Sequence, residues 1–243
     1  LSVAALDLGA GEGITTPITF VATSNAMAYC GLTPVFADIE ADSLNLSLSA
    51  TRAAMTDQTR LILPVHFAGL PADMEGFAQL ANEAGVSLLE DAAHAIGSEY
   101  GRGNAKTRVG ACRHSRATIF SFHPVKTMTT GEGGAVTTND PELYERLLSL
   151  RSHGITRDPA RLSEQPGSWW YEQQALGFNY RMTDIQAALG SSQLKKLDRF
   201  IDRRLAIVDQ YHRALSGVDW LRLPQSRGQD RIGYHLFVVQ MDF

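Results

Sequence analysis

Short runs rich in apolar residues recur along the first two thirds of the chain, and helical patterns or glycines separate them. They cover residues 34–39, 61–66, 86–90 and 117–122. Between two of them, residues 73–84 carry apolar side chains at steps of three and four before Gly85, which predicts an amphipathic helix. Continuous apolar strands connected by helices form parallel sheets that are covered on both faces. The sequence therefore predicts an α/β fold.

The rest of the chain carries weaker signals of the same kind. Residues 135–138 resemble a strand, Asp140 and Pro141 begin a helix, and the polar residues 155–174 predict a long loop. A capping box at Thr183–Gln186 begins a helical pattern to about residue 215, which Gly190 is expected to break or bend. Residues 235–243 look like a strand without a partner.

Charge and composition exclude several classes of protein. The 243 residues have a net charge of −4 and no long basic run, so nucleic acid is not an expected partner. No run of about 18 apolar residues predicts a membrane span, and no membrane partner is expected. Cys30 and Cys112 form no metal-ligand pattern, so no metal site is expected and a reduced, cytoplasmic protein is the simplest interpretation.

A glycine-rich segment at residues 9–13 invites comparison with phosphate-binding loops. It lacks the final glycine spacing of those loops, and no strand is expected before it. A plain turn is the favoured interpretation.

Two segments place candidate catalytic side chains where strands are expected to end. Asp91 and His94 follow the run 86–90, at the strand end where α/β sheets bind ligands, although a carboxylate there could also cap a helix. Lys126 follows the run 117–122 and precedes Gly131–Gly134; it is either a surface lysine or, if desolvated, a nucleophile toward carbonyl carbon. Pyridoxal phosphate enzymes need such a pair, a lysine for the Schiff base and an acid for the pyridinium nitrogen.

Four ordered motifs resemble those of the DegT–StrS type sugar-nucleotide aminotransferases, which are fold-type I pyridoxal phosphate enzymes. They cover residues 15–26, 90–97, 120–135 and 176–184. Within that family, residues 151–156, 169–172 and 192–198 look most like the UDP-sugar 4-aminotransferases of the pseudaminic acid pathway. The resemblance implies a mostly parallel seven-stranded sheet flanked by helices, followed by the start of a small α+β C-terminal domain.

The resemblance also implies a role for each matching residue. Lys126 matches the Schiff-base lysine and Asp91 matches the pyridinium partner. The remaining matches concern cofactor binding. Phe20 matches the aromatic residue that stacks on the ring, His94 matches the contact to the ring hydroxyl, and Ser121 matches a phosphate ligand. Asn179 matches a residue that binds the phosphate across a dimer interface, a role for which Arg181 is a chemically plausible substitute. Each also has a structural interpretation, such as core packing for Phe20 or a local turn for Asn179.

The sequence departs from the family pattern in two places. Family members carry a Gly-Thr helix start just before the position of Leu1, which is absent here. The segment after Gly13 is about three residues shorter than in the family. We therefore expect residues 1–215 to form a large cofactor-binding domain truncated at its N-terminus. Residues 216–243 are expected to begin a truncated small domain.

The implied reaction moves the amino group of L-glutamate to a UDP-linked 4-keto-6-deoxy-N-acetylhexosamine in a cytoplasmic homodimer. The polar loop 155–174, with Trp169, Trp170 and Tyr171, is either a wall of the sugar-nucleotide site or a structural interface. Alternatives are amination of another keto sugar nucleotide, at C3 or linked to dTDP or GDP, and a non-catalytic sensor or scaffold. A sugar 3-dehydrase is disfavoured because those relatives replace the Schiff-base lysine with histidine, whereas Lys126 is present.

Overall fold

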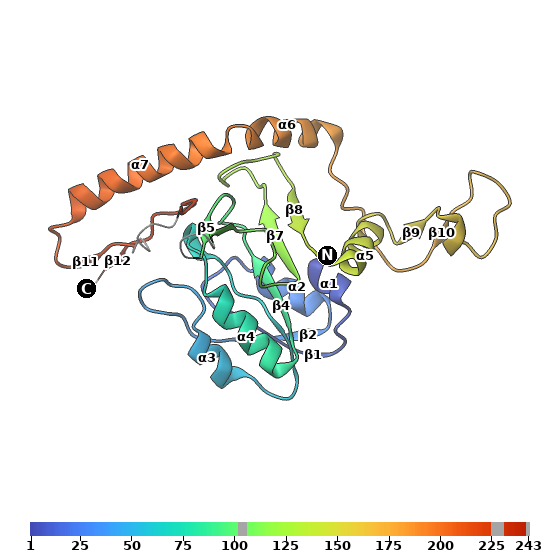
Figure 1. Cartoon of the computed structure of the whole chain (residues 1–243), viewed down its shortest axis with the longest axis horizontal. Helices are drawn as coiled ribbons and strands as arrows, with labels where there is room; N and C mark the ends of the chain where they lie inside the picture. The colour runs from blue at the N-terminus through green and yellow to red at the C-terminus, as the bar shows by residue number, and fades with distance from the viewer. Residues whose placement is uncertain (102–105, 225–230, 242–243) are drawn as a thin grey trace.

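A six-stranded, mostly parallel sheet forms the centre of the protein (Figure 1). The computed structural model describes residues 1–101, 106–224 and 231–241. In the order in which they lie side by side, the strands are β2 (Leu32–Phe36), β1 (Gly11–Thr15), β3 (Thr59–Ile62), β4 (Ser87–Asp91), β7 (Ala117–Ser121) and β8 (Gly134–Thr137). Only the pair β7–β8 within this sheet is antiparallel. The α/β prediction is confirmed. Within the described residues this sheet has six strands, whereas the family resemblance implied seven.

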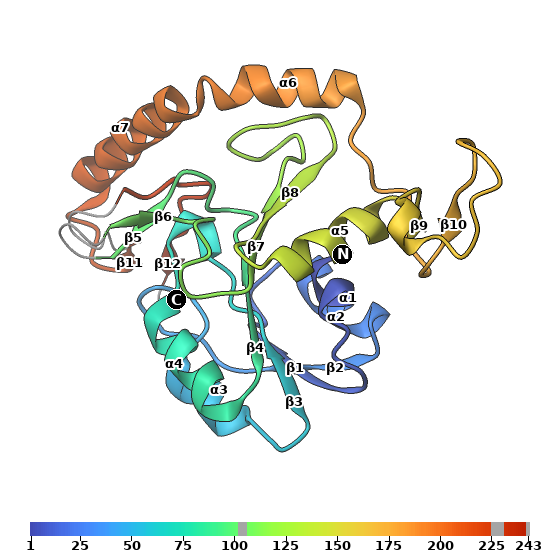
Figure 2. The same cartoon turned by 45° about the vertical axis from the view of Figure 1, so that its right-hand side comes forward.

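Helices cover both faces of this sheet (Figure 2). On one face lie α1 (Ser2–Leu6), α2 (Ala22–Tyr29) and α5 (Pro141–Arg151), and on the other lie α3 (Leu48–Ala54) and α4 (Met74–Ala84). Successive side chains of a strand point to opposite faces. Accordingly, Leu61 and Leu89 pack with α1, α2 and α5, whereas their neighbours Ile62 and Leu88 pack with α3 and α4. The sheet is thus buried on both sides, as its continuous apolar runs require.

Helix α4 begins and ends where its sequence predicts. The Asp73 side chain accepts a hydrogen bond from the Gly76 amide, which satisfies one of the free amides of the first turn. Gly85 ends the helix with a φ of 67°, a conformation that glycine adopts without steric cost. Phe77 and Leu80 are buried from this helix, so it anchors one side of the core.

The glycine-rich residues 9–13 do not form a plain turn, as the sequence suggested. Gly11 to Gly13 are the first residues of β1, which lies between β2 and β3. A side-chain carbon on Gly13 would lie 2.7 Å from the Met27 sulfur of α2. Glycine therefore serves close packing of a helix on a strand here, a role that spacing alone does not reveal.

The long C-terminal helical pattern is two helices, α6 (Asp184–Leu194) and α7 (Leu197–Leu215). The predicted capping box is confirmed, since Thr183 and Gln186 satisfy each other's backbone amides. The break falls at Lys195 and Lys196, not at Gly190. Gly190 is instead a contact point, because a side-chain carbon there would lie 2.8 Å from the Thr130 methyl carbon.

Residues 155–174, predicted as a loop, contain a small projecting arm. It is built from β9 (Ile155–Thr156), a 3-10 turn at Pro159–Arg161 and β10 (Glu172–Gln173), and β9 pairs antiparallel with β10. Figure 1 shows this arm extending away from the sheet at the end opposite α7. Hydrogen bonds from Ser163 to the Glu172 carboxylate close it and lower the pKa of Glu172 to about 2.

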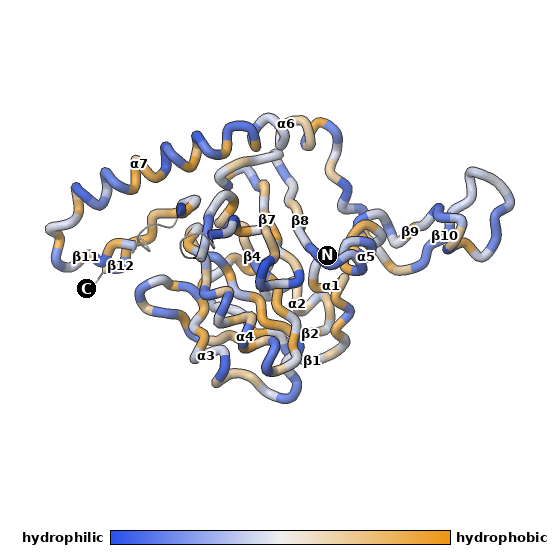
Figure 3. Tube along the Cα trace, in the orientation of Figure 1, coloured by the Kyte–Doolittle hydropathy of each residue, from blue (hydrophilic) through white to orange (hydrophobic). Residues whose placement is uncertain are grey.

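The C-terminal segment folds back beside α7. The strand predicted over residues 235–243 is mostly irregular, and the prediction that it lacks a partner is wrong: β12 (Gln240–Met241) pairs with β11 (Leu221–Arg222), while residues 242 and 243 lie outside the described part. Polar and apolar residues alternate along α7 in Figure 3, and its apolar Val208 packs on Ile232, Tyr234 and Leu70. This contact holds the C-terminal segment against α7 and against Leu70, which follows β3 in the chain.

Three short elements complete the described chain, namely β5 (Glu99–Tyr100), β6 (Thr107–Arg108) and a 3-10 turn at Phe67–Gly69. No helix in the described ranges is long and apolar enough to cross a membrane.

Candidate active site

Asp91 is the last residue of β4, at the carboxyl edge of the parallel sheet. Its carboxylate accepts a hydrogen bond from the Thr23 hydroxyl at 2.7 Å and one from the Ala93 amide at 3.0 Å. Its own backbone pairs with the residues after β3, since the Asp91 amide donates to the Pro64 carbonyl. The side chain is therefore fixed by contacts to α2 and to its own loop. Its oxygens can still accept from a ligand, because a carboxylate takes more than two hydrogen bonds.

Lys126 lies in the loop between β7 and β8. Backbone hydrogen bonds from Phe122 to Gly133 and from Thr130 to Phe122 close this loop, and the Lys126 amide donates to the His123 carbonyl. Because β7 is the parallel neighbour of β4, the loop begins beside Asp91. The half-buried lysine thus follows one strand end and the aspartate ends the next, which is the arrangement that the sequence predicted.

The electrostatics of this pair favour a reactive amine. Burial lowers the pKa of the Lys126 amine, while the nearby Asp91 carboxylate acts in the opposite direction. The lowering by burial is the larger effect. A lysine with a lowered pKa holds more of its neutral, nucleophilic form near neutral pH, so this amine is suited to attack carbonyl carbon and to carry a proton.

Two neighbouring histidine rings lie close enough to Lys126 to feel its charge. His94 follows β4, and its ring centroid lies 4.6 Å from that of His235 in the C-terminal segment. Burial, together with the charge of Lys126, lowers the pKa of His94 to about 3 and that of His235 to about 4. Arg204 of α7 adds to the effect on His235 and donates to its carbonyl. Both rings are therefore neutral near pH 7.

Phe20 and Ser121 lie next to this cluster through their chain neighbours. The Phe20 carbonyl accepts a hydrogen bond from the backbone amide of Thr23, the residue whose hydroxyl binds Asp91. The Phe20 side chain is 72% exposed. This exposure fits a ligand contact better than core packing. Ser121 ends β7, and its hydroxyl accepts from the His123 amide at 3.4 Å.

Asn179 is not brought to this cluster. It forms an isolated antiparallel bridge with Ser152 at the base of the projecting arm, where the Tyr180 amide donates to Arg151. None of its hydrogen bonds within the described residues joins it to Asp91 or Lys126. Within one chain, five of the six predicted site residues thus gather at one edge of the sheet and Asn179 lies apart.

Sequence reasoning missed Thr23 and His235. Thr23 lies inside the first family-like motif, but its bond to Asp91 spans 68 residues. His235 lies in a run that reads as an ordinary strand and reaches the site only because the chain folds back along α7. Neither residue carries a local signal, since both depend on contacts between distant segments.

A buried hydrogen bond between His66 and Glu90 supports the end of β4 from the opposite face, and the His66 Nδ1 atom accepts from the Ala72 amide. The His66 Nε2 atom lies 2.9 Å from the Glu90 carboxylate, and both side chains are fully buried. Ser115 also donates to Glu90. Burial acts to raise the pKa of Glu90, but its interaction with His66 and the hydroxyls of Ser115 and Thr118 lower this pKa overall. The pair fixes the residue that precedes Asp91.

The chain is similar in sequence to a spore coat polysaccharide biosynthesis protein, and in structure to several aminotransferases. The spore coat polysaccharide biosynthesis protein SpsC of Bacillus subtilis is 39% identical over the whole chain, which covers 61% of SpsC. Helicobacter pylori PseC, an aminotransferase of pseudaminic acid biosynthesis, is 35% identical with a TM-score of 0.87; the match covers 99% of this chain and 63% of PseC. The chain therefore spans about three fifths of the length of these relatives.

A further solved relative links the architecture to a cofactor. The putative sugar aminotransferase Spr1654 of Streptococcus pneumoniae, in its PLP form, is 27% identical with a TM-score of 0.85, over 99% of this chain and 64% of that protein. The sequence profile of one family matches residues 1–243. The chain therefore belongs to the DegT/DnrJ/EryC1/StrS aminotransferase family, whose enzymes use pyridoxal 5′-phosphate.

Proposed function

We propose that the full-length protein is an aminotransferase that moves the amino group of L-glutamate to a UDP-4-keto-6-deoxy-N-acetylhexosamine. The observation that carries this proposal is the pair formed by Asp91 and Lys126 at the ends of neighbouring parallel strands. The sugar substrate rests on the similarity to PseC. Amination at C4 and the UDP group are thus parts of the proposal that the experiment below tests separately.

The residues at this edge of the sheet fit pyridoxal phosphate. Asp91 offers a carboxylate with spare acceptor capacity, and Lys126 offers a half-buried amine of lowered pKa. The exposed Phe20 ring and the Ser121 hydroxyl supply an apolar face and a polar contact beside them. When bound, the cofactor supplies an electron sink for the bonds at the carbon that carries the amino group.

Lys126 is the residue that we assign to proton movement. An amine that burial makes less basic can take a proton from carbon and return it to a neighbouring atom at neutral pH. Asp91, held by Thr23 and Ala93, would accept a hydrogen bond from the ring nitrogen of the cofactor. Neutral His94 would donate a hydrogen bond to the ring hydroxyl, Phe20 would stack on the ring and Ser121 would bind the phosphate.

A labelling experiment on the full-length protein tests the proposed function. Isotope-labelled glutamate is incubated with 4-keto and 3-keto sugar nucleotides, and the products are identified by NMR. Label at C4 of the UDP sugar supports the proposal. If label is found only at C3, or only in dTDP or GDP sugars, the proposed substrate is wrong and the proposed amino transfer is retained. Absence of transfer, together with absence of a borohydride-fixed cofactor adduct at Lys126, favours the sensor or scaffold alternative.

We further propose a homodimer in which Asn179 reaches the partner's cofactor. Two observations support it: Asn179 lies away from the site of its own chain, and large apolar side chains are exposed around it and on α6. Leu176 is 89% exposed and Ile185 is 85% exposed. A second subunit covering this surface would bury these side chains, and the neighbouring arm would then face the partner's sugar nucleotide.

The proposed domain boundary lies at the end of α7. Residues 1–215 would form the large cofactor-binding domain and residues 216–243 would begin the small one, with His235 contributed to the site from the latter. Both cysteines are free thiols, which supports the cytoplasmic location that we propose.

A further inference from the structure

The turn after β3 contains a strained residue that contacts both histidines of the site. Ala68 has a φ of 57° and a ψ of 3°, in the left-handed region that residues with a side chain rarely adopt. Its amide donates to His94 Nδ1 at 3.3 Å, and its carbonyl accepts from the His235 amide at 2.9 Å. A non-glycine residue in this conformation persists only where its surroundings hold it in place.

The surroundings of Ala68 supply that restraint. His66, two residues earlier, donates its backbone amide to the Asp91 carbonyl and bonds the buried Glu90 through its ring. Gly69, one residue later, has its carbonyl bonded by the Ser98 hydroxyl, which in turn accepts from the Gly233 amide. The turn is thus tied to the end of β4 on one side and to the C-terminal segment on the other.

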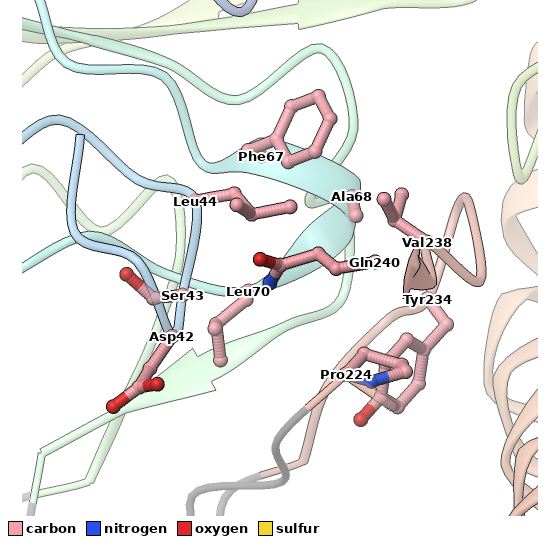
Figure 4. A pocket seen from close by; sticks show the side chains of 10 residues that line it. All are labelled: Asp42, Ser43, Leu44, Phe67, Ala68, Leu70, Pro224, Tyr234, Val238 and Gln240. Carbon is pink, nitrogen blue, oxygen red and sulfur yellow. The ribbon is translucent and has the colours of Figure 1, made fainter. Parts of the chain in front are cut away.

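Figure 4 shows the same turn beside the C-terminal segment. Phe67, Ala68 and Leu70 face Tyr234, Val238 and Gln240 across a small cavity. The turn and the segment therefore line one cavity, and they contact each other directly where Leu70 packs on Tyr234.

We propose that Ala68 is a positioning residue, whose backbone fixes His94 as the tautomer that carries its proton on Nε2 and docks His235 beside it. The proposal rests on the proposed function, in which His94 donates to an oxygen of the ligand. A neutral imidazole that accepts a hydrogen bond at Nδ1 must carry its proton on Nε2. In the described residues the Nε2 atom of His94 has no hydrogen-bond partner, so this donor is available to a ligand.

The charges around His94 support a single neutral form. Burial is the largest cause of its lowered pKa, followed by the charges of Lys126 and His235. Arg204 adds positive charge on the side of His235. The Asp91 carboxylate acts on Lys126, where its charge raises the pKa of the amine against the effect of burial.

The test is NMR of histidine side chains in the full-length protein without ligand, using proton–nitrogen correlations that distinguish the two tautomers. The His94 signals are assigned by their loss in His94→Asn. We expect one tautomer, protonated on Nε2, between about pH 5 and pH 8. A Nδ1-protonated ring, an average of both tautomers, or titration near the ordinary histidine pKa would overturn the proposal.

Two substitutions of Ala68 test the role of the turn itself. Ala68→Gly retains the amide and suits the left-handed conformation, so the tautomer is expected to be unchanged. Ala68→Val makes that conformation much less favourable, so a mixture of tautomers and a shift of the His235 signals are expected. An unchanged His94 spectrum in folded Ala68→Val would contradict the proposal; if this variant does not fold, the wild-type spectrum decides. Because no turnover is measured, failure of this proposal is distinct from failure of the proposed function.

Discussion

At the scale of single residues, the site depends on how Asp91 is held. Thr23 is buried, and its hydroxyl donates to the Asp91 carboxylate at 2.7 Å. Hydrogen bonds to charged groups contribute about 1.5–3 kcal/mol. We expect Thr23→Val to lower kcat/KM of the full-length enzyme about tenfold or more, because Asp91 loses its orientation. Thr23→Ser keeps the hydroxyl and should retain most of the activity. Equal losses in both variants would contradict this role.

Lys126 provides the second prediction at this scale. Lys126→Ala removes the amine, and we expect amino transfer to fall by about 10²–10⁴-fold or more in a steady-state assay. Cofactor adduct formation with borohydride should disappear from the peptide that contains residue 126. The matched control is Lys196→Ala, since Lys196 is exposed and makes no capping bond at the start of α7. Normal turnover in Lys126→Ala would remove the basis of the proposed function.

Residue types at strand ends were predictable from the sequence, whereas their partners were not. An acid after one apolar run and a lysine after the next indicate a common edge of a parallel sheet, and the structure places Asp91 and Lys126 in this way. Thr23 and His235 carry no such signal, because their importance arises from contacts with Asp91 and His94 that only the folded chain creates.

At the scale of elements, the end of β4 depends on the buried pair of His66 and Glu90. A buried donor left without its acceptor costs about 1–3 kcal/mol, and Glu90→Leu leaves the donors of both His66 and Ser115 without their acceptor. We expect Glu90→Leu to destabilise the protein in urea unfolding by about the sum of these two costs. Glu90→Gln can still accept from His66 and should cost about 1–3 kcal/mol. An equal loss in both variants would show that the hydrogen bond does not matter.

Helix α6 offers a milder test at the same scale. Thr183 caps the helix, and Gln186 also donates to the Glu132 carbonyl in the loop that holds Lys126. Thr183→Ala should destabilise the helix by about 1 kcal/mol, seen as faster amide exchange in α6. Thr183→Ser retains the oxygen and serves as the control. Faster exchange throughout the protein, rather than in α6, would contradict a local effect.

Element boundaries show where sequence reasoning succeeds and fails. The caps of α5 and α6 and the end of α4 at Gly85 were predicted, because Asp140, Thr183 and Gly85 act within one turn of their own position. The break between α6 and α7 near residue 195 and the packing role of Gly13 were not predicted, since each depends on a neighbouring element.

At the scale of the whole molecule, the C-terminal segment makes stability depend on pH. The folded-state pKa values of His94 and His235, about 3 and about 4, lie below the ordinary value of 6.5. The unfolded chain therefore binds more protons in this range, and stability falls as pH decreases below about 6.5. We expect the decrease in urea-unfolding free energy to be smaller in the double variant His94→Gln, His235→Gln. The control is His123→Gln, an exposed histidine. The same pH slope in the double variant and in wild type would contradict the prediction.

The exposed apolar surface leads to a prediction about assembly. Ile185 is 85% exposed on α6, and Ile185→Arg should shift the full-length protein toward monomers in sedimentation and lower its activity, since Asn179 would no longer reach a partner. Tyr144→Arg changes an exposed side chain on α5 and serves as the control. A wild-type monomer with full activity would contradict the proposed dimer.

The most direct test of the central claim follows the nitrogen atom itself. The full-length protein is incubated with isotope-labelled L-glutamate, pyridoxal phosphate and the UDP-4-keto-6-deoxy-N-acetylhexosamine, and the sugar product is examined by NMR. We predict labelled nitrogen at C4 of the sugar in wild type, with loss of labelling in Lys126→Ala. Labelling that persists in Lys126→Ala, or a wild-type protein that labels no sugar nucleotide at all, would contradict the account.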